Sequence, residues 1–304
     1  MLLPVEWINA AILSAAVVGV VNIIDSHLLS KRMPSLWAFL VPVAAIYLIY
    51  GSALLVLFPL PEGIGMLPVS VALASGACSA VAVILMLYAL TIEEVSKVIP
   101  VVHTFPVFVS VLAIPILGET LDYLHWIAII IVVAGVVTIA IRQDSTGPRI
   151  RLGKWLCLCM AASFLFAIAN IASKYALEYI SFWSMYSLSA LCMAFLFLSV
   201  SVRPSVLQEL RGLRQRGSAM ALIAFNETLA LVGILLSFWA VSRGPISLVS
   251  TVLGTRPFFV FIYAVILSRC YPVILEWRLS RETVALRLIS IVMIVAGIAI
   301  IYLS

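Results

Sequence analysis

Charged residues are scarce in this chain of 304 residues. They make up 10% of it, whereas 64% of the residues are hydrophobic and the mean hydropathy is +1.23. A soluble domain carries roughly 25% charged residues. A soluble globular fold is therefore excluded, and no polar domain is long enough for nucleic-acid recognition. The composition is that of a polytopic membrane protein.

Catalytic and metal-binding motifs are also missing. The chain has no Gly-x-x-x-x-Gly-Lys, His-Glu-x-x-His or Gly-x-Ser-x-Gly, which argues against P-loop ATP hydrolysis and against two common hydrolase types. The histidines at 27, 103 and 125 lack ligand spacing, and Cys157-x-Cys159 does not share a helix face. We predict neither an enzyme nor a cofactor or metal. The first apolar segment lacks a basic start and is too long for a signal peptide.

What the sequence has is apolar segments long enough to cross a membrane. A helical span needs about 20 such residues for about 30 Å of hydrocarbon. Ten segments qualify, and they lie near residues 7–29, 35–58, 68–91, 98–117, 122–141, 155–178, 182–202, 219–241, 245–267 and 284–303. We expect all ten to be helical, because irregular backbone cannot face lipid.

The two halves of the chain are similar to each other. Both "VVHTFPVFVS" (Val101–Ser110) and "VLGTRPFFVF" (Val252–Phe261) carry Thr-x-Pro, and 9 of 27 positions are identical without a gap when 87–113 is aligned with 238–264. Asn22 and Asn170 correspond in the first span of each half. We predict one repeat at 1–142, a basic linker at 143–154 and a second repeat at 155–304.

Each predicted repeat has five spans, so the second must enter the membrane inverted with respect to the first. The predicted fold class is thus an all-α membrane protein of ten transmembrane helices in two inverted five-helix repeats. Inverted repeats are typical of secondary transporters, whose site lies near the midplane where the repeats meet. Duplication without transport, as in a membrane scaffold, is the alternative.

One stretch resembles a known family. The segment "LYALTIEEVSKVIPVVHTFPVFVSVLAIPILGETL" (Leu87–Leu121) is similar to the third and fourth helices of an EamA repeat, of the drug/metabolite transporter superfamily. The marks are the alanine-containing helix end, the proline in the fourth helix and the closing Gly118-Glu119. The second repeat departs from this pattern with Ser268-Arg269-Cys270. The resemblance implies carriage of small metabolites without ATP, with export of amino acids or related compounds as one expectation.

Two charges lie deep within predicted spans. Arg256 is near the middle of the ninth and Glu227 follows Asn226 in the eighth. A charge at the bilayer centre costs about 2.5–3.5 kcal/mol on insertion scales, so each needs a reason. Arg256 could clamp an anionic or zwitterionic cargo, or it could pair permanently with Glu227. A protonated Glu227 would suit proton coupling, and the sequence leaves both readings open.

Other polar residues complete the candidate site. Asp25 could serve in coupling, and the polar candidates for substrate binding are Arg256, Glu227, Asn226, His103, Thr104, Thr255, Asn22, Asn170 and Lys174. Pro106 and Pro257 remove backbone donors and are expected to kink helices that face a central cavity. Snorkelling explains Asp25 and Lys174 about as well as function does.

Basic residues predict the orientation. Fifteen of the 18 lysines and arginines fall in loops on the side opposite the termini, and only Arg243 falls in a loop on the terminal side. The positive-inside rule then places both termini outside, most simply across a plasma membrane, although many relatives are thought to keep them inside. The expected partners are a small metabolite, protons and membrane lipids, with a monomer or weak homodimer. Translocation of a lipid-linked phosphate, or a role as a non-transporting assembly subunit, remains an alternative function.

Overall fold

The computed structural model describes residues 5–93, 95–140, 154–213, 216–270 and 281–303, and every element within them is helical. They are α1 (Val5–His27), the π-helical turn η1 (Leu28–Arg32), α2 (Leu36–Leu57), α3 (Met66–Ile92), α4 (Val95–Val102), α5 (Phe105–Leu117), α6 (Tyr123–Ala140), α7 (Lys154–Ala176), α8 (Phe182–Ser201), α9 (Pro204–Arg211), α10 (Arg216–Arg243), α11 (Ile246–Leu253), α12 (Arg256–Cys270) and α13 (Arg281–Leu303). The predicted linker lies outside these residues except for its last position.

Eight helical segments of the described chain are long and apolar enough to cross a membrane. They coincide with predicted spans one to four and six to nine. Predicted spans five and ten fall on α6 and α13, whose described apolar stretches are shorter, Tyr123–Thr138 and Ile289–Ile301. The chain is thus an integral, multi-pass, all-helical membrane protein. Serine caps begin two of its spans, because Ser35 accepts from Ala38 N (3.2 Å) and Ser181 from Ser184 N (3.1 Å).

Two of the spans are interrupted in the middle. The predicted span 98–117 is split between α4 and α5 at residues 103–104, and the span 245–267 is split between α11 and α12 at 254–255. In both breaks the threonine amide bonds three residues back, Thr104 to Val101 (3.2 Å) and Thr255 to Val252 (3.1 Å). A proline follows as the second residue of the next helix, where its missing N–H costs nothing.

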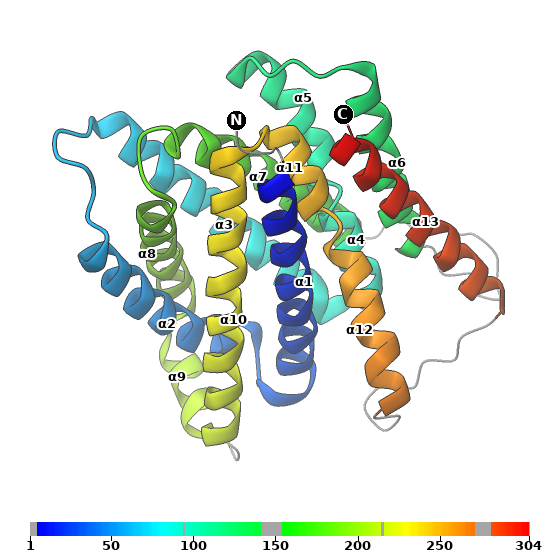
Figure 1. Ribbon diagram of the computed structural model, residues 1–304. Helices are drawn as coiled ribbons and strands as arrows, with labels where there is room; N and C mark the ends of the chain where they lie inside the picture. The colour runs from blue at the N-terminus through cyan, green and yellow to red at the C-terminus, as the bar shows by residue number, and fades with distance from the viewer. Residues whose placement is uncertain (1–4, 94, 141–153, 214–215, 271–280, 304) are drawn as a thin grey trace.

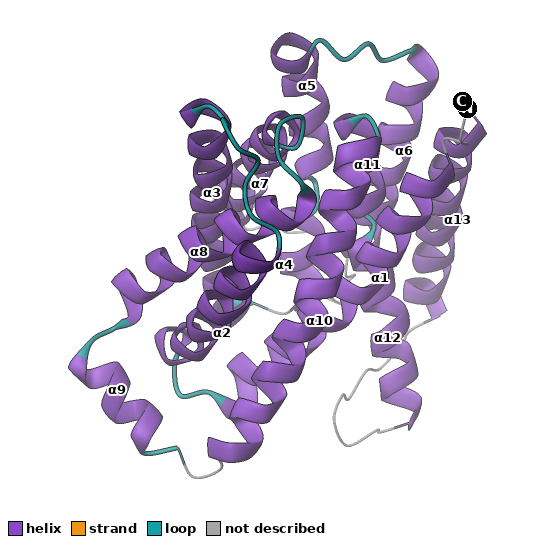
Figure 2. Cartoon of the chain, turned by 60° about the vertical axis from the view of Figure 1, so that its left-hand side comes forward, coloured by secondary structure: helices purple, strands orange, loops and turns teal. Residues whose placement is uncertain are grey.

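The helices pack in long antiparallel contacts, α3 along α7, α1 along α10, α2 along α8 and α6 along α13. Both termini lie at one end of the bundle, called here the terminal face (Figure 1). The short helix α9 lies at the other end, called the opposite face, and far from α5 (Figure 2). Connectivity places the ends of α5, α7 and α10 and the start of α11 at the terminal face.

Small residues allow the closest helix contacts. A Cβ at Gly76 of α3 would lie 2.8 Å from the Ser189 Cα of α8, and one at Gly233 of α10 would lie 2.6 Å from Val18 of α1. Such contacts suit a membrane, where packing rather than the hydrophobic effect holds helices together. They draw α1, α3, α8 and α10 around a common centre.

Candidate substrate-binding site

A cavity of about 190 Å³ lies at that centre. Its wall comes from α1, α2, α3, α7, α8 and α10 and from residues at or beside the two helix breaks, namely His103, Phe105, Leu253 and Arg256. Most of the wall is apolar, with five phenylalanines and two methionines among its side chains: Phe39, Phe105, Phe166, Phe197, Phe238, Met86 and Met193. A cavity of this kind takes a ligand with an apolar body.

Arg256 forms a cationic end of the cavity. It is the first residue of α12, so the partial positive charge of that helix N-terminus adds to its own. Its Nε is buried and has no hydrogen-bond partner, and the side chain is among those that line the cavity. His103 is close enough to interact with Arg256 and is 3% exposed, and its Nδ1 also lacks a partner.

Two carboxyl groups form an acidic end. Asp25 of α1 accepts a hydrogen bond from Asn226 Nδ2 of α10 at 2.7 Å. The next residue, Glu227, is 4% exposed and near enough to Asp25 for the two charges to interact. Tyr47 of α2 and Tyr186 of α8 are polar neighbours of Glu227. Asp25 and Glu227 both line the cavity.

Arg256 and Glu227 do not form an ion pair among the contacts of the described residues. The ion pair identified there joins Glu6 to Arg243, and Arg256 keeps an unpartnered nitrogen. Further buried polar atoms of the cavity wall lack partners too, namely Asn22 Nδ2, Tyr186 Oη and Ser189 Oγ. Buried polar groups are nearly always hydrogen-bonded, so a set of unpartnered ones around one cavity indicates a polar ligand.

One segment of the chain matches a known protein family. Residues 5–141 match the family model of the EamA-like transporter family. This segment, a little under half of the chain, is thus similar to that family. The match suggests a membrane transporter of the drug/metabolite superfamily rather than an enzyme, and it includes the segment Leu87–Leu121 that resembles an EamA repeat.

Solved structures show the fold of the whole chain. Twenty-five chains match it, and one crystal structure of a protein is 16% identical, with a TM-score of 0.65, over 98% of this chain and 95% of that one. At this identity the likeness concerns the fold alone. No curated protein matches the chain at a significant level.

The structure brings many of the sequence candidates together and leaves others apart. Arg256, Glu227, Asp25, His103, Asn22 and Asn170 line the cavity. Asn226 is fully buried and donates a hydrogen bond to Asp25. Thr104 and Thr255 bond to backbone carbonyls within the breaks, and Thr104 also reaches Ser163. Lys174 bonds carbonyls of α10 and its following turn at the terminal face, and does not pair with Asp25.

Sequence reasoning missed five polar side chains of the cavity wall, Tyr47, Ser79, Tyr186, Ser189 and Ser237. Tyrosine and serine are common in transmembrane helices, so nothing in the sequence distinguishes these from the others. No group of three or more histidine, cysteine or acidic side chains in the described part of the chain is arranged to hold a metal ion.

Proposed function

We propose that this EamA-like protein is a secondary transporter for a small zwitterionic metabolite with an apolar body, such as an amino acid. The observation that carries the proposal is Arg256, whose buried Nε has no partner, in a cavity that also holds the Asp25–Glu227 carboxyl pair. A guanidinium with free donors binds a carboxylate bidentately, and a carboxyl pair balances an ammonium group. The phenylalanines and methionines of the wall would contact the rest of the molecule.

The size of the cavity supports a small cargo. An engineered cavity of about 150 Å³ holds benzene, so about 190 Å³ suits one ring or one branched aliphatic chain. A lipid-linked phosphate with a long chain would not fit inside it. Amino acids with large apolar side chains meet both the size and the charge requirements.

The proposal includes ten spans, two inverted repeats and alternating access. The pairing of helices supports it. If the first half repeats as α7, α8, α10, α11–α12 and α13, then the contact of α3 with α7 is the equivalent of the contact of α10 with α1. The contact of α5 with α7 likewise has its equivalent in that of α12 with α1. Exchanging the conformations of two such halves would open the cavity to the other side.

Coupling would use the same carboxyl pair. Two neighbouring carboxylates in a place sheltered from water cannot both stay ionised without a cation. Either a bound proton or the ammonium group of the cargo could neutralise the carboxyl pair. Binding of the cargo would then release a proton, and release of the cargo would allow a proton to bind. We propose that the protein exports its cargo across the plasma membrane, driven by a proton gradient or by the cargo's own gradient, with termini external as the charge count predicts.

A panel of matched ligands tests the charge requirement. Thermal shift of the purified protein is measured with phenylalanine, phenethylamine (no carboxylate) and phenylpropionate (no ammonium), and counterflow in proteoliposomes follows for binders. We expect phenylalanine to bind at least about tenfold more tightly than either truncated ligand, because each lacks one charge-assisted contact. In Arg256→Ala, phenylalanine should bind no better than phenethylamine.

Two results would contradict the proposal. Equal binding of all three ligands by the wild-type protein would show that the charged ends do not recognise a zwitterion. Retained preference for phenylalanine over phenethylamine in a folded Arg256→Ala variant would remove Arg256 from carboxylate binding. Arg256→Lys is the matched control, since it keeps the charge but loses bidentate geometry and should bind with intermediate affinity.

A further inference from the structure

The turn between α10 and α11 is held in place by side chains from several other helices. Glu119, just after α5, accepts hydrogen bonds from Ile246 N (2.5 Å), Ser247 N (3.2 Å) and Ser247 Oγ (2.5 Å). Pro245, the cap position of α11, makes no side-chain cap of its own. A carboxylate 127 residues earlier therefore caps the N-terminus of α11, where negative charge is favoured.

The backbone of Gly118 is what aims Glu119 at this helix end. Gly118 closes α5 in the left-handed conformation, with φ of 67°, which residues other than glycine rarely adopt. The amides of Gly118 and Glu119 bond back to Ile114 and Ala113. Gly-Glu is thus a structural unit, in which the glycine turns the chain and the glutamate reaches across to α11.

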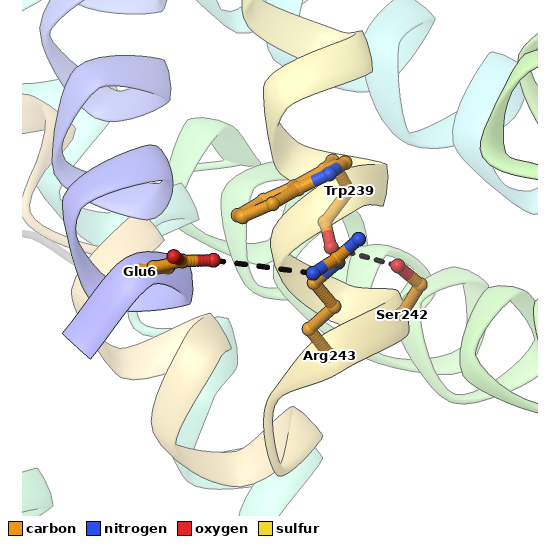
Figure 3. Close-up of polar contacts among 4 residues, drawn as sticks. All are labelled: Glu6, Trp239, Ser242 and Arg243. Carbon is orange, nitrogen blue, oxygen red and sulfur yellow. Dashed lines mark hydrogen bonds and ion pairs between the residues drawn. The ribbon is translucent and has the colours of Figure 1, made fainter. Parts of the chain in front are cut away.

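Two other contacts hold the same turn. Lys174 of α7 donates to Val241 O (2.8 Å) and Gly244 O (2.9 Å) at the end of α10, and its charge interacts with that of Glu119. Arg243 lies 4.5 Å from the Trp239 ring centroid and 4.0 Å from a Glu6 oxygen of α1 (Figure 3). Glu6 and Arg243 are each 56% exposed, so their ion pair contributes little.

Among the contacts that hold this turn, those of Glu119 are the stronger link between the halves. Lys174, α10 and α11 all belong to the second half, so the Lys174 bonds do not join one half to the other. Glu119 belongs to the first half, is half-buried and makes three charge-assisted bonds. These bonds lie at the terminal face, whereas Asp25 near the end of α1 places the acidic end of the cavity toward the opposite face.

We propose that Glu119 is the latch that keeps the cavity closed toward the terminal face. Opening to that face would require α5 and α11 to separate, and the cap would then break. The latch is a positioning device of the transport cycle and rests on the proposed function, because a protein that does not alternate needs no latch. Its loss should shift the population toward the state open at the terminal face.

Accessibility labelling tests the latch. Ser237→Cys places a thiol in the cavity wall in a background whose native cysteines are replaced by alanine. A membrane-impermeant thiol reagent is applied to either face of proteoliposomes of defined orientation. We expect Glu119→Gln to raise the rate of labelling from the terminal face by about tenfold, the effect of losing one charge-assisted bond, and to lower the rate from the opposite face.

Control variants distinguish the loss of a specific latch from a general destabilisation of the helix packing. Glu62→Gln removes an exposed carboxylate from the α2–α3 loop of the terminal face and should leave both rates unchanged. Glu119→Asp keeps the charge and should restore part of the closed population. Unchanged labelling in a folded Glu119→Gln protein, or an equal rise from both faces, would overturn the latch. Absence of counterflow in the wild-type protein would instead count against the proposed transport.

Discussion

Asp25, Glu227 and Arg256 are energetic exceptions, because they are charged residues that line a buried cavity within the spans. Each costs about 2.5–3.5 kcal/mol to place at the bilayer centre on insertion scales. Asp25 recovers part of that cost through its bond from Asn226, yet the Asn226 Oδ1 is left without a partner. Such sites are incompletely satisfied without a ligand, and this makes them the residues through which a cargo stabilises the protein.

Asp25→Asn is expected to remove the negative charge at this position without destabilising the fold. The asparagine carbonyl oxygen can still accept from Asn226 Nδ2, so thermal stability should not fall. The negative charge is lost, and phenylalanine should bind about tenfold more weakly because its ammonium loses a charge-assisted partner. Thermal shift with phenylalanine and phenylpropionate measures the difference. If both ligands lose affinity equally, Asp25 supports the cavity rather than the ammonium.

Single residues differ in how much of their role the sequence discloses. Arg256 and Glu227 are visible because a charge inside an apolar run is rare and expensive. Whether they pair with each other is not visible, since that depends on how α10 and α12 are placed. Glu119 was visible only as part of a family mark, because the backbone amides that it caps lie 127 residues away in sequence. Tyr47 and Tyr186 carry no sequence signal at all.

Among the elements, the two broken helices define the centre of the molecule. The break after α11 contacts the break after α4, since a Cβ at Gly254 would lie 2.7 Å from Pro106 Cγ and 3.3 Å from His103 O. Repeated Thr-x-Pro predicted bent helices in both halves. Contact between the two breaks was not predictable, because no local pattern specifies which residues meet across 150 positions.

Gly254→Ala tests this contact. The added methyl group would force the breaks apart and displace His103 and Arg256, and such overpacking costs about 1–3 kcal/mol. We expect a lower melting temperature and weaker phenylalanine binding. Gly217→Ala is the matched control, because nothing lies within 4 Å of its added Cβ and alanine favours the helix. A stable Gly254→Ala protein with full affinity would show that the breaks can separate freely.

At the scale of the whole molecule, hydropathy alone gave the membrane class and the positions of the eight long spans. It worked because lipid forces each crossing segment to be apolar and helical over a fixed length. The relation between halves is harder to predict, since apolar bias makes any two spans look alike. The prediction of two related halves therefore depended on the matching Thr and Pro residues. The linker predicted between the halves lies outside the described residues except for its last position.

Reporter fusions test inversion and orientation together. Five spans per half require a reporter fused at residue 143 and one fused at the C-terminus to lie on opposite sides of the membrane. The charge count further predicts that a cytoplasm-dependent fluorescent reporter is bright at residue 143 and dark at the C-terminus, while a periplasm-dependent phosphatase gives the reverse. Both positions on one side would rule out inverted repeats. Opposite sides in the reversed sense would keep the inversion but show that the basic loops face outward, and the external-terminus prediction would then be wrong.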